Sequence, residues 1–334
     1  MRILSVVESF GHGGAETVLT SLVLGLPEHE HRVVHFSGSN RLPCHRPFLD
    51  ALERGGVRCD DRHWDSLNDR VGRAEALGGF RPDVVFFHWW GNDPWLRWIG
   101  PLGDVPLGQR PFFVCVLHHF GIRPAPVYDR YVLVSESQRP QLAPEARRRA
   151  VVIPNGVDLG RFPSARTARA DGRDMIVGRL SRLADGKIPA DWVRTATSFG
   201  LRDTRFAIAG DGDLCRRLER DARELNVEER FSFAGYVPRA RVPSFLVGLD
   251  VFCYQTSTAT ECHPLALLEA LASGTPVVAE TRGGIPEIVT HGENGLLASS
   301  SDEIGEHLHR LRLEPDLRHR LARRARESAR RLSL

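Results

Sequence analysis

Two cations that lie close together in the chain, Arg179 and Lys187, are the first residues that suggest chemistry. The chain has 334 residues with 45 Lys and Arg, and Lys187 is its only lysine. A compact ammonium and a planar guanidinium bind anions differently, so one retained lysine indicates a position where arginine does not fit. Arg179 lies at the end of a predicted strand, and an arginine fork and a lysine charge on the loop that follows can hold a diphosphate. A Walker motif is excluded because Ser181 and Ile188 replace its glycine and its Ser or Thr. An ordinary surface loop remains the alternative.

Two carboxylates lie around the start of a predicted helix. The stretch 264–274 is amphipathic and made of good helix formers, with proline at its first turn and glycine before the next strand. Glu261 then lies in the loop before the helix and Glu269 two turns inside it. Carboxylates placed in this way can accept hydrogen bonds from sugar or ribose hydroxyls, while the unpaired N–H groups of the helix start bind a phosphate. Those N–H groups belong to His263, Leu265 and Ala266. A glycosidase pair is disfavoured, because its carboxylates must face each other across the cleaved bond.

A glycine-rich turn, residues 11–16, follows the first predicted strand and precedes a helix. Gly13 and Gly14 allow the backbone to come close to an anion at the helix N-terminus. The turn is not a full dinucleotide motif, because Glu16 stands at the third glycine position. A tight turn without a ligand explains the pattern equally well.

His118 and His119 follow directly after another predicted strand, residues 112–117. A histidine just past the carboxyl end of a parallel strand faces the crevice where ligands bind, and its neutral imidazole can hydrogen-bond a hydroxyl or a carbonyl. Neighbouring residues face opposite ways, so one of the two can serve. A loop histidine without function is the alternative, and a metal site is disfavoured because no third ligand stands at a suitable spacing.

These candidates lie at the ends of short apolar runs that alternate with amphipathic stretches. Such runs suit strands buried on both faces, and the alternation predicts an α/β fold with doubly wound parallel sheets. We expect strands at 3–7, 33–36, 84–87, 112–117, 131–134, 151–153, 175–177, 205–209, 231–234, 250–253 and 276–279, and helices at 15–26 and 47–55. A polar, aperiodic stretch begins at residue 161, which predicts two Rossmann-like domains facing across a cleft, 1–158 and 159–334.

Composition excludes several classes of protein. A hydrophobic content of 42% with 26% charged residues describes a folded globular protein, and a net charge of +3 gives no reason to expect a nucleic-acid partner. Six cysteines without a C-x-x-C spacing are expected to be free thiols in a reducing compartment. The first apolar run is too short for a signal peptide, and no run of 18 apolar residues occurs. We therefore expect a cytoplasmic protein, with peripheral contact at the inner membrane face left open by the basic run 318–331.

Nine different short motifs follow one another along the chain in a definite order. They are Gly13-Gly14-Ala15-Glu16, Ile153-Pro154-Asn155-Gly156-Val157-Asp158, Gly178-Arg179-Leu180, Ala209-Gly210-Asp211-Gly212, Gly235-Tyr236-Val237-Pro238, the segment from Glu261 to Glu269, Ser273-Gly274-Thr275-Pro276-Val277-Val278, Gly283-Gly284-Ile285-Pro286-Glu287 and Asn294-Gly295-Leu296-Leu297. Together their order and spacing resemble a family 4 glycosyltransferase of the GT-B fold over nearly the whole length.

The resemblance implies an enzyme that moves a sugar from a nucleotide-diphosphate donor to an acceptor hydroxyl with retention of anomeric configuration, and that needs no metal and no other cofactor. It implies that Arg179 and Lys187 hold the diphosphate, that Glu261 binds the donor sugar and that Glu269 binds the ribose. His118, in preference to His119, lies beside the transferred sugar by the same resemblance. The remaining nucleotide-sugar contacts that it implies come from Gly13, Gly14, Asn155, Val237, His263, Pro264, Leu265 and Ala266. The expected partners are the donor and a sugar, lipid-linked or small-molecule acceptor.

The chain departs from the family's pattern at two places. The spacing from Arg179 to Lys187 is wider than usual, so Arg182 is the alternative cation. His263 and Pro264 stand where Phe-Gly is common, and proline removes one backbone donor near the phosphate.

Two other functions remain open. The departure at Pro264 and the end of the chain at Leu334 leave room for a weak or non-catalytic subunit that binds carbohydrates or nucleotide sugars, and a sugar-nucleotide epimerase-like enzyme can use the same fold. For the acceptor, the aromatic stretch 88–98 suits stacking on a sugar or contact with a lipid interface. Packing beneath a long loop explains that stretch equally well.

Overall fold

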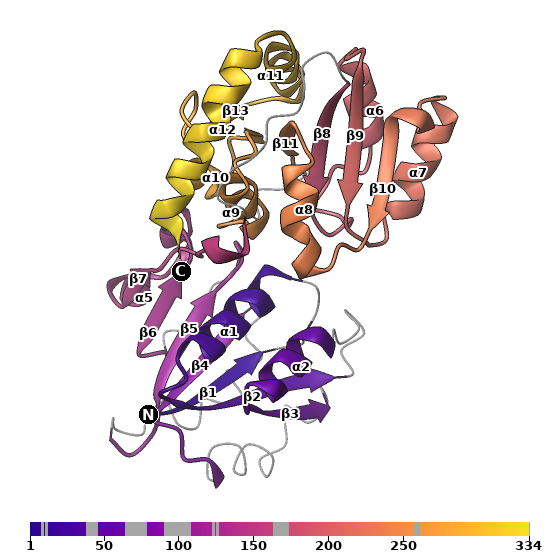
Figure 1. The fold of residues 1–334 in the computed structure, drawn as a ribbon. Helices are drawn as coiled ribbons and strands as arrows, with labels where there is room; N and C mark the ends of the chain where they lie inside the picture. The colour runs from indigo at the N-terminus through magenta and orange to yellow at the C-terminus, as the bar shows by residue number, and fades with distance from the viewer. Residues whose placement is uncertain are drawn as a thin grey trace. The chain divides into compact units, whose positions relative to one another are not determined.

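The structure is a computed structural model, and it describes residues 1–7, 10, 13–37, 46–63, 79–89, 108–121, 124, 127–162, 174–256 and 261–333. The predicted aromatic stretch beyond residue 89 and most of the predicted polar stretch after residue 161 lie outside these residues. The chain divides into two compact units, Met1–Pro154 and Asn155–Leu334 (Figure 1). The division falls four residues before the domain boundary expected from the sequence.

The first unit contains a parallel sheet in which seven strands are described, in the order β3-β2-β1-β4-β5-β6-β7. The strands are β1 (Arg2–Val7), β2 (Glu30–Ser37), β3 (Arg58–His63), β4 (Val84–Trp89), β5 (Phe112–Leu117), β6 (Arg130–Leu133) and β7 (Ala150–Val152). The described helices are α1 (Gly14–Gly25), α2 (Arg46–Arg54), α5 (Pro144–Arg148) and the 3₁₀ segment η3 (Glu136–Gln141). The strand order reverses between β1 and β4, where sheets of this kind bind ligands.

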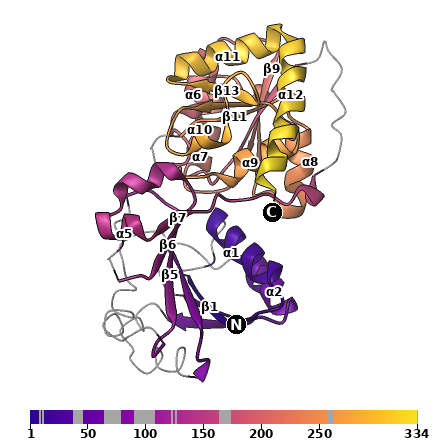
Figure 2. The same cartoon turned by 90° about the vertical axis from the view of Figure 1, so that its left-hand side faces the viewer.

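Alternate residues of each strand pack on opposite faces of this sheet. Val33 belongs to a cluster with Leu19 of α1 and Leu49 of α2. Val34, the next residue, belongs to a second cluster that includes Ala146 of α5. Helices α1 and α2 therefore cover one face, as Figure 2 shows, and the sheet is buried on both sides as the continuous apolar runs predicted.

The second unit contains a sheet in which six strands are described, all parallel, in the order β10-β9-β8-β11-β12-β13. The strands are β8 (Met175–Leu180), β9 (Thr204–Ala209), β10 (Phe231–Gly235), β11 (Val251–Tyr254), β12 (Val277–Glu280) and β13 (Gly295–Ala298). The described helices are α6 (Trp192–Ser198), α7 (Cys215–Glu224), α8 (Val242–Val247), α9 (Leu265–Ala272), α10 (Ile285–Ile288), α11 (Ser301–Leu313) and α12 (Pro315–Ala329), with 3₁₀ segments η4 (Leu159–Arg161), η5 (Glu228–Arg230), η6 (Arg239–Arg241) and η7 (Arg330–Leu332). Here the order reverses between β8 and β11.

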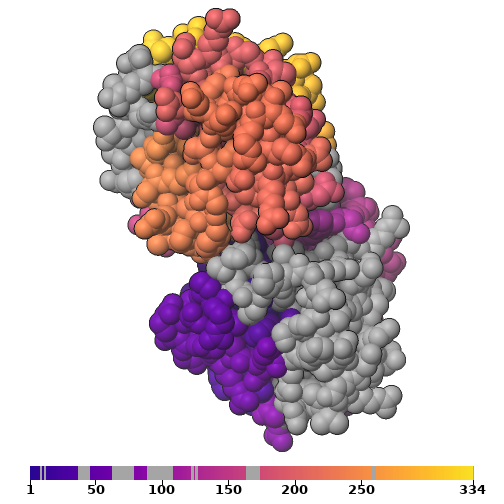
Figure 3. All heavy atoms as spheres, turned by 90° about the vertical axis from the view of Figure 1, so that its right-hand side faces the viewer, coloured from indigo at the N-terminus to yellow at the C-terminus, as the bar shows by residue number. Residues whose placement is uncertain are grey.

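Alternation along β11 separates the two cores of the second unit. Val251 and Cys253 pack with residues of α6, α7 and α11 on one face. Phe252 and Tyr254 pack with residues of α8, α9, α10 and α12 on the other. The segment from β9 to α8, coloured salmon to orange, forms one outer face of this unit (Figure 3). The predicted fold class, two doubly wound parallel sheets, is confirmed.

The sequence did not predict two of the described strands. β3 reads Arg-Cys-Asp-Asp-Arg-His and has no apolar run, because it is an edge strand held partly by an ion pair between Arg32 of β2 and its own Asp60. β13 has only four residues between polar loops, although Leu296 is fully buried. Buried strands are recognised in a sequence by a continuous run of four to eight apolar residues, and neither β3 nor β13 contains such a run.

Two further properties concern the helices and the cysteines. Within the described ranges, no helix combines the length and the apolar character that crossing a bilayer requires. The five cysteines placed by the structure are free thiols; they are Cys59, Cys115, Cys215, Cys253 and Cys262.

Candidate functional site

The second unit places an ion pair across its reversal of strand order. Lys187 lies on the loop after β8 and Glu261 follows β11, and these two strands are neighbours. Lys187 Nζ donates to Glu261 Oε1 over 2.7 Å, with side chains that are 25% and 8% exposed. The structure therefore brings together two residues that lie 74 positions apart and that the sequence had singled out separately. Arg182, the alternative cation, has no ion-pair partner among the residues described.

Arg179 is fully buried and contacts the backbone of Lys187. Its Nε donates to Ser181 Oγ over 3.2 Å, and its Nη2 donates to the carbonyl oxygen of Lys187. Its guanidinium carbon lies 5.2 Å from the ring centroid of Tyr254, whose hydroxyl donates to Glu261. Burial lowers the pKa of Arg179, and Nη1 has no hydrogen-bond partner among the described residues. Arg179 thus supports the backbone of Lys187 through one nitrogen, while its Nη1 makes no hydrogen bond to the described residues.

Two glycines allow the loop after β9 to support the Lys187 loop. Gly210 has a φ of +133°, and a Cβ there would lie 1.8 Å from the carbonyl oxygen of Ser181. A Cβ on Gly212, at φ +147°, would lie 2.4 Å from the carbonyl oxygen of Leu183. Leu183 N–H in turn donates to Asp211 O over 2.8 Å. Only glycine permits this close approach, which explains the two glycines of the Ala209-to-Gly212 motif.

Helix α9 begins at Leu265, after a short turn that follows Glu261. Pro264 is the N-cap residue, no side chain caps the helix, and Leu265 and Ala266 form its partly buried first turn. Asn155 Nδ2 donates to the carbonyl oxygen of His263 over 2.7 Å and so ties the start of the second unit to this helix. Burial lowers the pKa of His263 to about 4, which leaves a neutral imidazole next to the helix N-terminus.

Glu269, on α9, is surrounded by arginines. Arg161 Nη1 lies 3.8 Å from Glu269 Oε1, and Arg161 Nη2 donates to the carbonyl oxygen of Arg239 over 2.7 Å. Burial raises the pKa of Glu269, while Arg239 and Arg161 act against that shift. Val237, two residues before Arg239, packs against the same core as α9. Glu269, the predicted ribose contact, and Val237, a predicted nucleotide-sugar contact, therefore pack around one core, together with two arginines that the sequence did not single out.

In the first unit, helix α1 begins next to the reversal of strand order. Gly13 is its N-cap residue, with extended backbone at φ −111° and ψ 170° and no side-chain cap, and Gly14 is its first residue. Thr17 Oγ1 donates to the carbonyl oxygen of Gly13 over 3.2 Å. Residues 11 and 12 of the predicted turn lie outside the described residues.

His118 forms a pair with a second histidine. His88, at the end of β4, has its Nδ1 3.1 Å from His118 Nε2. Burial lowers the pKa of His118 to about 4 and holds that of His88 well below its ordinary value. His119 points elsewhere, because its Nδ1 lies 2.7 Å from the carbonyl oxygen of Phe120. His88 was missed as a partner because strand order, which makes β4 and β5 neighbours, cannot be read from strand positions alone.

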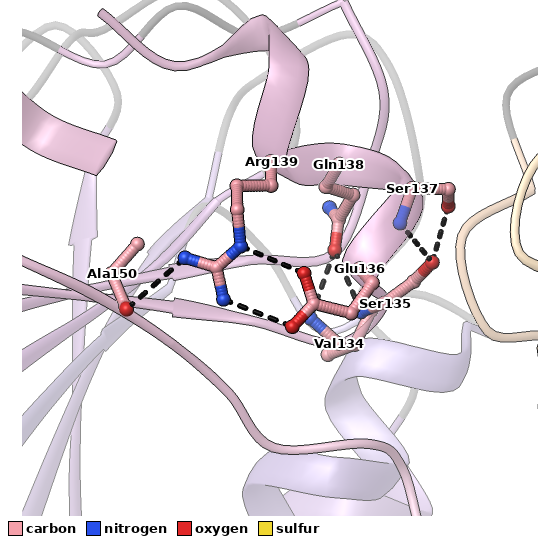
Figure 4. A network of polar contacts seen from close by, with 7 residues as sticks. All are labelled: Val134, Ser135, Glu136, Ser137, Gln138, Arg139 and Ala150. Atoms are coloured by element: carbon pink, nitrogen blue, oxygen red, sulfur yellow. Dashed lines mark hydrogen bonds and ion pairs between the residues drawn. The ribbon is translucent and has the colours of Figure 1, made fainter. Parts of the chain in front are cut away.

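A buried glutamine holds the loop that carries His118. Gln138 of η3 accepts hydrogen bonds at Oε1 from the N–H groups of Val134 and Ser135, over 2.8 and 3.1 Å (Figure 4). Its Nε2 donates to the carbonyl oxygens of Leu117 and His119, over 3.0 and 3.3 Å. All four bonds of the amide group are made, and they tie the end of β5 to the end of β6.

Comparison with known proteins agrees with this arrangement. A family described as Glycosyl transferases group 1 matches residues 169–328, and one described as Glycosyltransferase Family 4 matches residues 12–161. The putative colanic acid biosynthesis glycosyltransferase WcaL of Salmonella typhimurium is 32% identical over 154 residues, 44% of this chain and 37% of the relative. The GDP-mannose-dependent alpha-(1-6)-phosphatidylinositol monomannoside mannosyltransferase of Mycolicibacterium smegmatis is 34% identical over 164 residues, 45% of this chain and 43% of the relative. The chain thus aligns with less than half the length of either curated relative.

Solved structures share the fold over the whole chain. Anabaena Alr3699/HepE, solved in complex with UDP and glucose, superposes with a TM-score of 0.79 at 19% identity and covers 100% of this chain and 95% of its own. A glycosyltransferase from Rickettsia africae gives 0.79 at 16% identity, over 100% and 94%. Two Rossmann-like units with candidate residues at both reversals of strand order define the GT-B class of architecture. With a family match over each unit, the chain belongs to the family 4 glycosyltransferases.

Proposed function

We propose that the chain transfers a sugar from a nucleoside-diphosphate donor to an acceptor hydroxyl, with retention of anomeric configuration. The observation that supports this best is the Lys187–Glu261 pair above the buried Arg179, at the reversal of strand order in the second unit. When a charged sugar donor binds, the ion pair between Lys187 and Glu261 can open, and each residue can then bind a group of the donor instead. Lys187 then meets the diphosphate and Glu261 the sugar hydroxyls.

Electrostatics accounts for the rate in this proposal. As the bond between the anomeric carbon and the diphosphate oxygen breaks, positive charge builds on the sugar and negative charge on the diphosphate. Lys187, Arg179 Nη1 and the uncapped start of α9 stabilise that negative charge, in the place of a divalent cation. The acceptor oxygen bonds to the anomeric carbon on the same face, and its proton passes to the departing diphosphate. The products are a glycoside and a nucleoside diphosphate, and no protein nucleophile takes part.

The remaining predicted residues position the donor. Glu269 accepts hydrogen bonds from the ribose, and the backbone of Val237 meets the base. Gly13 and Gly14 provide a helix N-terminus without a side-chain cap, which suits an anion. The relatives suggest which donors to test first, because one is described as GDP-mannose-dependent and HepE was solved with UDP. Their names also favour an acceptor that is a glycan or a glycolipid of a bacterial polysaccharide or glycoconjugate. A lipid acceptor would require peripheral contact at a membrane, and this contact is part of the proposal.

A screen of nucleotide sugars tests the proposal. Purified protein is combined with UDP-, GDP-, ADP- and dTDP-sugars in a thermal-shift assay, and then with pooled glycan and glycolipid acceptors followed by mass detection of products. Stabilisation by one donor and formation of its glycoside support a transferase. Binding without consumption would instead indicate a binding subunit, and conversion of the donor without an acceptor would indicate an epimerase-like enzyme.

Matched variants connect the result to the site. Lys187→Ala is expected to abolish turnover, whereas Arg182→Ala, which removes a cation from the same loop, is expected to retain most of it. Equal loss in both variants would show that the charge of the loop matters and the position of Lys187 does not.

A further inference from the structure

The two histidines at the carboxyl ends of β4 and β5 form a hydrogen bond with a defined geometry. The rings of His88 and His118 are parallel within 12°, their centroids lie 5.4 Å apart, and the facing nitrogens lie 3.1 Å apart. Atoms of face-to-face stacked rings would approach to about 3.5–4.0 Å. The two rings therefore lie edge to edge and nearly in one plane, which is the geometry of a straight N–H···N bond.

Only one proton lies between the two facing nitrogens. Both imidazoles are neutral near pH 7, because burial lowers the pKa of each. A neutral imidazole has one N–H and one bare nitrogen. Either His88 donates from Nδ1 to His118, or His118 donates from Nε2 to His88.

The surroundings of His88 decide between these two arrangements. His88 is buried, and its Nε2 has no hydrogen-bond partner among the residues that the structure describes. If His118 donated, the proton of His88 would have to lie on that Nε2, and a buried N–H without an acceptor is unfavourable because nothing offsets its loss of hydration. If His88 donates from Nδ1, its Nε2 is a bare lone pair, and buried acceptors without a partner are more common in proteins than buried donors.

We propose that His88 is a positioning residue that fixes His118 as the Nδ1–H tautomer, so that His118 meets its ligand as a hydrogen-bond donor and not as a base. The Nε2 lone pair of His118 is occupied by His88. The Nδ1–H group suits a hydroxyl oxygen of the transferred sugar, and it leaves the departing diphosphate to take the proton of the acceptor. The tautomer follows from the geometry of the pair and the neutrality of both buried rings, whereas its use in catalysis rests on the proposed function.

The tautomer can be measured without a ligand. The full chain is labelled with nitrogen-15 histidine, long-range correlation spectra are recorded near pH 7.5, and the signals of His118 are assigned from their loss in His118→Gln. We expect a protonated Nδ1 and a bare Nε2, which is the less common tautomer of imidazole in water. A protonated Nε2 on His118 would overturn the inference.

Variants test whether the tautomer matters for turnover. His88→Leu keeps apolar volume and removes the donor, so His118 should shift toward the Nε2–H form and kcat should fall on the order of tenfold, with a smaller change in KM. His35→Leu, a control at another buried histidine of the same sheet, should change neither. A changed tautomer with unchanged kcat would refute the positioning role.

The two proposals fail in different ways. An inactive wild-type protein whose His118 carries the Nδ1 proton counts against the proposed function alone. An active protein whose His118 carries the Nε2 proton counts against this inference alone. If His88→Leu does not fold, the wild-type spectrum still decides the tautomer.

Discussion

Replacing Lys187 with alanine should lower the free energy of unfolding of the second unit by about 2 kcal/mol. Exposed ion pairs contribute about 0–1 kcal/mol, and removing one partner of a fully buried pair costs about 3–5 kcal/mol. The pair lies between these limits, because Glu261 is almost buried and Lys187 is one quarter exposed. After the substitution the Glu261 carboxylate keeps the hydroxyl of Tyr254 as a partner, which limits the cost.

A double-mutant cycle isolates the pair itself. Lys187→Ala, Glu261→Gln and the combined variant are unfolded in urea, and the coupling energy should be about 1 kcal/mol. Trp192, buried in the core of the second unit, reports on this unit after labelling with fluorotryptophan. The Arg205–Asp174 pair serves as the control, because it has the same 2.7 Å separation but far greater exposure, and its coupling should stay below about 0.5 kcal/mol.

The same cycle connects stability to function. With a saturating donor the coupling between Lys187 and Glu261 should fall, because the diphosphate takes the lysine and the sugar takes the carboxylate. Lys187→Ala should weaken nucleoside-diphosphate affinity by about ten- to hundredfold, the value of a charge-assisted hydrogen bond. The reasoning is refuted if the coupling equals that of the exposed control pair, or if a bound donor leaves it unchanged.

Three further predictions concern buried polar groups. Arg161→Gln removes a cation beside Glu269, so the pKa of Glu269 should rise further. Nucleotide affinity, measured by calorimetry, should then fall more at pH 6 than at pH 8. An equal loss of affinity at both pH values would exclude this mechanism. His118 and His263 bind protons less readily in the folded state than in the unfolded state. The free energy of unfolding should therefore fall as the pH falls from about 6.5 toward 4, by up to about 3 kcal/mol for each histidine. A free energy of unfolding that stays constant over that range would contradict the neutrality of the two rings. Gln138→Leu removes four hydrogen bonds to backbone groups and should cost the first unit about 2–4 kcal/mol in urea unfolding. A loss below about 0.5 kcal/mol would show that water replaces the amide.

The sequence predicted the fold because most strands are buried on both faces, and such strands have continuous apolar runs. It also predicted that Lys187 and Glu261 belong to one site, although from motif order and not from contact. What it could not provide was strand order, which decides that β8 lies next to β11 and β4 next to β5. The partners that depend on that order, above all His88 for His118, follow from the sheet and have no spacing of their own in the sequence.

The single lysine of this arginine-rich chain has a physical explanation in the second unit. The carbonyl oxygen of Lys187 accepts a hydrogen bond from the buried Arg179, so the backbone of Lys187 is fixed. The side chain of Lys187 can still rotate from one anionic partner to another. An arginine at this position could hold Glu261 through two parallel bonds, which would be stronger and harder to exchange for a diphosphate. Lysine offers one compact charge with rotatable donors, and it binds Glu261 through one oxygen. In the proposed function the lysine must release Glu261 each time a donor binds, and this requirement favours the weaker and more mobile cation.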